Sequence, residues 1–207
     1  MIKVVLNPLF YVLIGCFLAS CSTVDISEQV TQPEDKKKAL VDLLPESWSV
    51  RGRIAVLHPD ENWHAHFVWR QKKENYQLKF SGPLGQTQLF VEHKQNPQTN
   101  EQFNTLIMGD NKYQNNQSME LLLEQFSPVN IPLTSLKYWL YGQPNPYTPF
   151  QVTKDKEEKI IQLHQLGWLI DFKKYQNSLP WVYPNKITAQ KRQHKIKVFI
   201  KQREFEG

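Results

Sequence analysis

The chain has 207 residues, a formal net charge of +5 and two cysteines, a length that suits one domain with a substantial core. No RRM, KH or helix-turn-helix pattern is present, which argues against nucleic acid as a partner, whereas the mild basicity could favour an anionic lipid surface or an acidic protein. Six tryptophans, eight tyrosines and eleven phenylalanines predict a large apolar interior in an otherwise hydrophilic chain.

The N-terminus carries the features of a secretory signal peptide. Lys3 precedes an apolar run over 4–17, and small residues follow it. The run is shorter than the ~20 residues of a membrane-spanning helix, so a signal anchor is the weaker alternative, as is a signal peptide without lipidation. The run ends in Leu18-Ala19-Ser20-Cys21, which resembles the lipobox of bacterial lipoproteins.

This resemblance implies that residues 1–20 are removed and that Cys21 is acylated. The mature chain would then have 187 residues, and a charge of +4, because Lys3 is lost. No disulfide could form, since Cys16 leaves with the signal and Cys21 carries lipid. In lipoproteins of Gram-negative bacteria an aspartate after the cysteine commonly favours the inner membrane, so Ser22 suggests the outer membrane.

Residues 21–33 are polar and aperiodic, which predicts a flexible tether. The remaining residues, 34–207, are expected to form one domain. A short helix is predicted over 34–44 from apolar residues at helical spacing before Pro45. Alternating apolar and polar residues then predict four strands, with Gly52 as a bulge or a point of close approach in the first of them. These strands span 48–56, 63–70, 76–80 and 87–91.

The turn between the third and fourth strands is unusual. It reads Ser81-Gly82-Pro83-Leu84-Gly85, in which proline and two glycines specify the backbone. A turn tip is ordinarily polar, and this one carries a leucine. Leu84 could point outward towards an apolar partner, or it could pack back onto the sheet.

A strand is predicted over 102–108, followed by two helices. The first starts at Ser118, a plausible N-cap, and continues to Phe126 before Pro128. The second covers 133–141 and stops at Gly142. From Phe150 strands return, and four can be delimited, with Leu166-Gly167 turning the first pair. They span 159–165, 168–175, 181–190 and 194–201.

This order of elements predicts a mainly β protein. About eight to ten strands with two short central helices suggest a curved antiparallel sheet or an open barrel, with the helices over its mouth or concave face.

Several fragments, taken in this order, resemble the LolB family of outer-membrane lipoprotein receptors. No fragment is specific alone, but their order covers essentially the whole mature chain. The joining segment Ser127-Pro128-Val129-Asn130 and the charged tail beyond Lys201 depart from the pattern. The fragments are Arg51-Gly52, the aromatic strand 63–69, residues 82–85, Ile131-Pro132-Leu133, the run 139–144, Gly167-Trp168 and a basic closing strand.

The resemblance implies an incomplete antiparallel barrel with a helical lid over an apolar cavity. It implies a monomeric, outer-membrane-anchored, periplasm-facing receptor that accepts acylated lipoproteins from a LolA-like carrier and inserts them into the outer membrane. No cofactor and no enzymatic activity are implied.

Large apolar strand and helix positions are the candidates for lining such a cavity, and an ordinary packed core is the alternative for each. Sequence alone cannot separate the two groups. The candidates are Trp48, Val50, Ile54, Val56, Trp63, Phe67, Trp69, Leu78, Phe80, Leu89, Leu136, Trp139, Trp168 and Ile170.

Other polar motifs carry weaker signals. His64 and His66 share one strand face, but no further ligand at a recognisable spacing supports a metal site, so a solvated face is preferred. The basic cluster 191–195, with Lys197 and Lys201, fits a hairpin turn and a solvated strand; a role at anionic lipid or an acidic carrier is the alternative. No G-x-S-x-G, H-E-x-x-H or P-loop pattern is present.

A second function therefore stays open beside the receptor: a structural or assembly lipoprotein whose sheet is a protein docking platform. An open apolar concave face would favour the receptor, and a filled core would favour the platform. The apolar tip at Leu84 favours the receptor.

Overall fold

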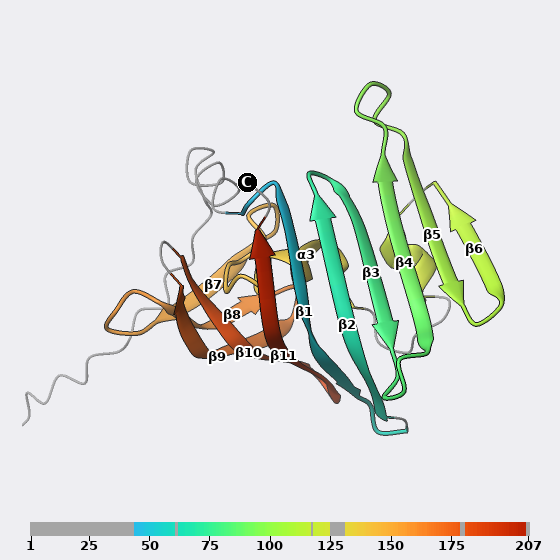
Figure 1. Ribbon diagram of the computed structural model, residues 1–207. Coiled ribbons are helices and arrows are strands. Elements are labelled where there is room, and N and C mark those ends of the chain that lie inside the picture. The colour runs from blue at the N-terminus through green and yellow to red at the C-terminus, as the bar shows by residue number, and fades with distance from the viewer. Residues whose placement is uncertain (1–43, 61, 117, 125–130, 179–180, 206–207) are drawn as a thin grey trace, which may run out of the picture.

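The computed structural model describes residues 44–60, 62–116, 118–124, 131–178 and 181–205. Within these ranges one antiparallel sheet of eleven strands curves around a pair of short helices (Figure 1). The predicted signal peptide, Cys21, the tether and all of the 34–44 helix except Leu44 lie outside the described residues.

The first six strands form a meander on one side of the sheet. They are β1 (Ser47–Leu57), β2 (Asn62–Lys72), β3 (Asn75–Ser81), β4 (Thr87–Gln95), β5 (Gln102–Met108) and β6 (Asn111–Asn115). The helices α2 (Met119–Glu124) and α3 (Leu133–Trp139) follow, and five strands then complete the sheet. These are β7 (Phe150–Lys154), β8 (Ile160–Gln165), β9 (Trp168–Ser178), β10 (Trp181–Lys191) and β11 (His194–Phe205).

The strand order explains why the barrel is open. Neighbours run β6-β5-β4-β3-β2-β1-β11-β10-β9-β8-β7, so the first and last strands of the domain, β1 and β11, pair at the centre. The outer strands β6 and β7 are the two edges, and they do not pair with each other. The expected open antiparallel architecture is therefore confirmed.

The central pair β1 and β11 contains the predicted irregularity at Gly52. The register shifts between Arg51 and Gly52, which leaves Lys201 as the extra residue on β11. A Cβ atom on Gly52 would lie 2.3 Å from the carbonyl oxygen of Phe199 and 2.8 Å from the ring of Phe67. Only glycine fits where the backbone approaches this closely, so the predicted close approach at Gly52 is confirmed, while the bulged residue lies opposite it on β11.

Both helices are bounded by local signals. Ser118 caps α2, because its hydroxyl accepts a 3.1 Å hydrogen bond from the amide of Leu121. Gly142, with a φ of +69°, ends the turn after α3: its amide bonds the carbonyl of Trp139 and the next amide bonds that of Tyr138. The helix stops at Trp139, two residues before the predicted end, since Leu140 and Tyr141 already belong to this turn.

Several strand predictions need correction, and β4 and β9 continue to Gln95 and Ser178, beyond their predicted ends at 91 and 175. Strand β6 was not predicted, because Asn111–Asn115 is polar apart from one tyrosine. Strand β7 lies in a segment that had no delimited strand. Strand β11 continues to Phe205, beyond the predicted end at Lys201. The two-residue turn at Leu166-Gly167 is confirmed by the pairing of Gln165 with Trp168.

Candidate functional site: the covered sheet face and the tip turn

The apolar residues singled out in the sequence gather on one face of the curved sheet and on α3. Trp63 and Leu89 are partly buried and pack against the others, and the remaining candidates are buried in one cluster. The buried candidates are Trp48, Val50, Ile54, Val56, Phe67, Trp69, Leu78, Phe80, Leu136, Trp139, Trp168 and Ile170.

Aromatic rings fill much of this interior. Trp48 lies 5.8 Å from Trp69 and 5.1 Å from Tyr141, measured between ring centroids. Trp139 of α3 meets Trp168 at 6.4 Å in an edge-to-face arrangement. These are the offset and edge-on geometries that aromatic pairs prefer, so the interior is a packed cluster with defined contacts.

The space left between α3 and the sheet is small. A cavity of about 10 Å³ remains there, which is about the room that one water molecule needs. Binding pockets for small molecules usually measure about 300–1,000 Å³. Within the described residues, the part of the interior beneath α3 is therefore apolar and nearly filled. Its walls are Ile54, Phe67, Trp69, Leu78, Phe80, Leu136, Leu140 and Val198.

Sequence reasoning missed two of these walls, Leu140 and Val198. Leu140 was expected within the second helix but was not among the cavity candidates. Val198 alternates with Ile196 and Ile200, both buried, so the period of two in β11 could have identified it.

Buried hydrogen bonds fasten the C-terminal end of α3 to the sheet. Gln165, at the end of β8, is 2% exposed and accepts bonds from the indole nitrogen of Trp139 at 2.9 Å and the amide of Asn145 at 3.0 Å. Its own amide nitrogen donates to the carbonyl of Asn145 and the hydroxyl of Thr148. Because every polar atom of this buried group is paired, breaking one contact leaves others unsatisfied.

Arg203 of β11 makes a second attachment. Its guanidinium donates to the carbonyl of Leu140 at 2.9 Å, to Pro184 and to the side chain of Asn185. Burial lowers the pKa of Arg203 to about 10, although the rings of Tyr141 and Tyr183 lie beside it. Within the described residues it has no carboxylate partner, so neutral acceptors alone hold this cation.

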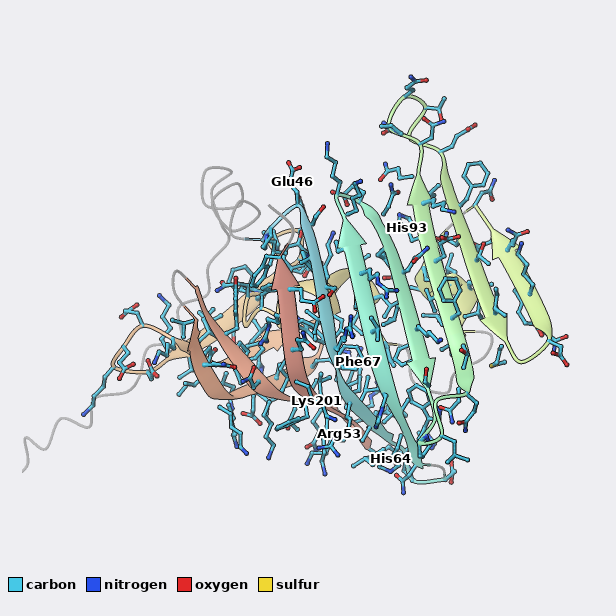
Figure 2. The ribbon with its side chains drawn as sticks, viewed as in Figure 1. Glu46, Arg53, His64, Phe67, His93 and Lys201 are labelled. Atoms are coloured by element: carbon cyan, nitrogen blue, oxygen red, sulfur yellow. The ribbon has the colours of Figure 1, made fainter. Side chains whose placement is uncertain are left out.

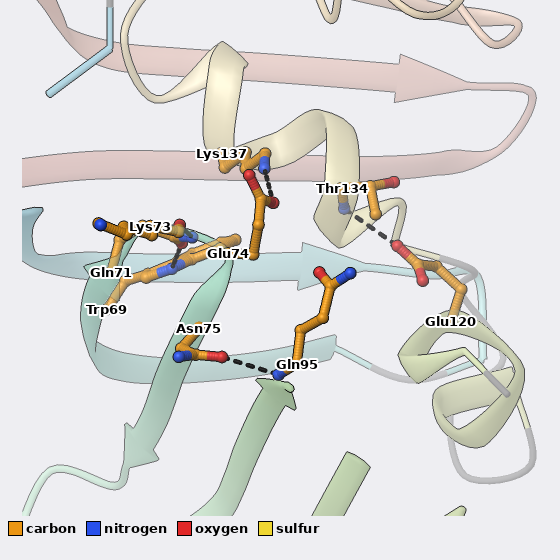
Figure 3. Close-up of polar contacts among 9 residues, drawn as sticks. All are labelled: Trp69, Gln71, Lys73, Glu74, Asn75, Gln95, Glu120, Thr134 and Lys137. Atoms are coloured by element: carbon orange, nitrogen blue, oxygen red, sulfur yellow. Dashed lines mark hydrogen bonds and ion pairs between the residues drawn. The ribbon is translucent and has the colours of Figure 1, made fainter. Parts of the chain in front are cut away.

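Two further contacts at the surface, one near each end of α3, also hold the helical pair (Figure 3). Glu120 of α2 accepts a 3.0 Å bond from the amide of Thr134 and so caps α3. Lys137 lies 3.5 Å from Glu74 in the β2–β3 turn, where Glu74 is largely exposed. Exposed ion pairs contribute about 0–1 kcal/mol, so the Lys137–Glu74 pair adds little to the buried bonds of Gln165 at the same end of α3.

The β3–β4 turn projects Leu84 away from the sheet. The amide of Gly85 bonds the carbonyl of Gly82 at 3.0 Å, with Pro83 and Leu84 at the two central positions. Gly85 has a φ of +85°, which L-residues rarely adopt. The Leu84 side chain is 94% exposed, so it does not pack back onto the sheet.

The histidines of β2 lie on the other, outer face. His64 and His66 are exposed, and the residues described contain no group of three or more metal-ligating side chains. Neither α2 nor α3, the helices in the described part of the chain, is long and apolar enough to cross a membrane.

Comparisons of structure place this fold among known ones. A DUF1329 family protein from Desulfovibrio piger superposes with a TM-score of 0.58 at 7% identity, covering 83% of this chain and 91% of that one. A lipoprotein-sorting protein domain from Vibrio parahaemolyticus gives 0.54 at 11% identity over 84% and 90%. A LolA superfamily protein from Nitrosomonas europaea gives 0.51 at 9% identity over 84% and 93%. These identities support the shared fold alone.

Comparisons of sequence are more specific. The outer-membrane lipoprotein LolB of Cellvibrio japonicus is 28% identical over 160 residues, which cover 75% of this chain and 76% of the relative. That of Stutzerimonas stutzeri is 24% identical over 193 residues, covering 91% and 90%. The family model described as outer membrane lipoprotein LolB matches residues 46–202, from the start of β1 almost to the end of β11. The chain therefore belongs to the LolB family of outer-membrane lipoproteins.

Proposed function

We propose that this protein receives acylated lipoproteins from a LolA-like periplasmic carrier, holds their acyl chains between α3 and the sheet, and releases them into the outer membrane. The observation that carries the proposal is the large apolar face of an unclosed sheet, covered by helices with polar attachments. Membership of the LolB family and the LolA-like fold support a role in lipoprotein localisation.

The size of the task explains why such an interior is needed. A triacylated client exposes on the order of 45 methylenes, which corresponds to roughly 35 kcal/mol at ~0.8 kcal/mol each. Such chains need continuous apolar shelter outside a membrane. The aromatic and aliphatic side chains under α3 offer that shelter once the helix moves.

Entry of a client beneath α3 would displace this helix, because the cavity there measures about 10 Å³. The surface contacts of Lys137 and Glu120 would yield first, and the buried bonds of Gln165 and Arg203 would act as the hinge. Acyl contacts then replace the contacts that α3 loses. Transfer runs downhill by tighter acyl binding than in the donor, without a nucleotide.

A transfer assay tests this function. The mature chain is mixed with a carrier–lipoprotein complex, and the client is followed by co-purification. The client should move to this protein without ATP, and an apolar fluorescent dye bound to the protein should be displaced by a long acyl chain. A requirement for ATP would refute the proposal, as would a failure of the acyl chain to displace the dye.

The docking platform is the second candidate, and the small size of the cavity beneath α3 favours it. If the sheet only presents a surface to other proteins, α3 stays in place. The client would then remain on the carrier, and no dye would enter. The same assay therefore separates the two functions.

Leu84 is proposed to act in delivery. An exposed leucine at a tip lowers solubility unless it meets an apolar phase, and the membrane that would hold Cys21 is such a phase. Burying one leucine contributes only roughly 1.5–3 kcal/mol, which is too little for an anchor but enough to orient the domain at a bilayer. Gly82, Pro83 and Gly85 would hold the side chain outward during this contact.

The variant Leu84→Glu tests this role. It should fold and accept clients normally, yet insert them into lipid vesicles more slowly, because a carboxylate resists entry into the bilayer. Phe103→Glu is the control: Phe103 is 56% exposed and lies at the other end of the sheet, where β5 begins. Normal delivery by Leu84→Glu would refute the role.

The anchor is proposed at Cys21. Mass spectrometry of the mature N-terminus should show acyl groups on this residue. A chain that starts at another position without lipid would refute the proposal.

A further inference from the structure

The outer face of the central strands carries cations in two adjacent cross-strand rows. In one row Lys186, Phe199, Arg53 and His66 lie side by side on β10, β11, β1 and β2. The next row contains Lys197, Ala55 and His64 on β11, β1 and β2. All seven project away from the buried face, since they alternate with core residues.

A hollow of about 450 Å³ lies over these rows. The small side chain of Ala55, between Lys197 and His64, leaves room at its centre. Pro83 of the tip turn is also part of the wall, so the hollow lies beside Leu84. Figure 2 shows Arg53 and His64 at the same lower end of β1 and β2.

The hollow is cationic, and the nearest carboxylate in the row of Lys197 is Asp171, which lies two strands away beyond Thr188. No carboxylate is among its walls, and Arg53, Lys186 and Lys197 form no ion pair with any described residue. Arg53 lies 5.7 Å above the ring of Phe199, and Lys174 lies 5.7 Å from the same ring. Several cations around one hollow raise the positive potential within it, so this arrangement favours a bound anion.

We propose that this hollow binds the phosphate groups of anionic phospholipids at the membrane surface. An arginine fork and lysine ammonium groups around a space of this size suit phosphate oxygens. The position of Pro83 selects a bilayer as the source: if Leu84 enters the apolar layer, the hollow lies at the level of the headgroups. The inference thus rests on the delivery role proposed for Leu84.

The cations would add to the effect of the leucine. Each lysine or arginine near an anionic surface strengthens binding about fivefold, and the effect decays within a Debye length of about 10 Å at 0.1 M salt. Leu84 and the hollow together would hold the domain in one orientation at the bilayer. A lipid anchor alone does not set an orientation.

Binding to vesicles tests the proposal. The mature chain with Cys21→Ala, which has no lipid anchor, is sedimented with phosphatidylcholine vesicles that contain or lack phosphatidylglycerol. The double variant Arg53→Gln/Lys197→Gln should bind the anionic vesicles about 25-fold more weakly and the neutral vesicles unchanged. Arg53→Lys should keep most of the binding, since it retains the charge.

The control removes the same charge elsewhere. Lys112→Gln/Lys156→Gln alters exposed lysines on β6 and in the β7–β8 turn. It should weaken binding much less than the double variant in the hollow. Equal losses would show that only the net charge matters and would overturn the proposal. Thermal unfolding confirms that each variant is folded before it is compared.

Two further arms identify the ligand and separate this inference from the proposed function. If low concentrations of inorganic phosphate do not release the protein from anionic vesicles, the result supports a lipid headgroup as the ligand. Complete release at low phosphate would overturn the proposal in favour of a free anion. If the double variant loses client uptake from the carrier but keeps vesicle binding, the partner is an acidic protein and the proposal fails. Leu84→Glu could deliver clients normally while the double variant still binds anionic vesicles more weakly. That result would refute the delivery role of Leu84 and leave the phosphate site supported.

Discussion

At the scale of single residues, the polar side chains inside the apolar interior set the position of α3 against the sheet. Gln165 and Arg203 each join the segment after α3 to a strand through several hydrogen bonds. Neither was predicted from the sequence. Gln165 occupies an inward position of β8 where an apolar residue is usual, and Arg203 lies in a charged tail that was not expected to continue the strand. The apolar candidates were predictable because alternation alone places them on one face.

Replacing Gln165 should destabilise the fold. The variant Gln165→Leu leaves the indole nitrogen of Trp139 and the amide of Asn145 without an acceptor, and each such loss costs about 1–3 kcal/mol. We expect the free energy of unfolding in urea to fall by about 2–4 kcal/mol. Gln162→Leu on the same strand is the control: Gln162 is half-buried and bonds only Asp171. Equal effects of the two changes would contradict the importance of the buried group.

Alkaline pH should also destabilise the protein. Burial raises the pKa of Tyr183 to about 12, and it raises the pKa of four other tyrosines as well. The folded state then keeps protons that the unfolded chain releases above pH ~10, so stability falls as pH rises through 10 and beyond 12. The lowered pKa of Arg203 acts in the opposite sense above pH 10, but it is one group against five. Tyrosinate absorbance should therefore rise together with the loss of structure. Release of these protons from the intact fold near pH 10 would contradict this account.

At the scale of elements, edge strand β6 shows what the pattern of apolar residues cannot reveal. Its side chains are mostly polar, and it is held by the ladder to β5 and by amide contacts such as Asn104 with Asn115 at 3.0 Å. Backbone pairing needs no hydrophobic alternation, so the strand was missed. The turns after β8 and α3 were predictable, since glycine marks both.

The end of α3 offers a test of one such glycine. A methyl group on Gly142 would lie 2.9 Å from Pro184 and 3.1 Å from the hydroxyl of Tyr175, at a φ of +69°. Gly142→Ala should therefore cost about 1–2 kcal/mol for the backbone and more for the contact. Gly109→Ala, at a φ of +58° with open space around it, should cost the backbone part only. Urea unfolding measures both, and equal losses would show that the contact relaxes freely.

At the scale of the whole molecule, the open sheet and its lid were predictable, and the close packing beneath α3 was not. The order of strands and helices in the sequence predicts the open sheet, and the resemblance to the LolB family predicts that the helices cover it. The remaining volume depends on how aromatic rings interlock, as between Trp48, Trp69 and Tyr141. A sequence lists these rings but does not fix their packing.

Hydrogen exchange tests whether the packed region beneath α3 opens. In the free protein the amides of α3 should be protected by their contacts with the sheet. Binding of a lipoprotein should reduce protection in α2 and α3 while β1, β2 and β11 stay protected, because the central ladder remains paired. Uptake of a client without any change in α3 would contradict the proposed route of entry.

The two unpaired edges, β6 and β7, give the sheet a freedom that a closed barrel lacks. In a closed barrel the strand number and stagger fix the radius. Here the sheet can coil more tightly or flatten by small changes of twist, and every ladder hydrogen bond survives. The width of the interior can therefore vary with the curvature of the sheet. If the protein binds acylated clients as proposed, we expect the same gradual flattening of the sheet to accommodate clients of different size.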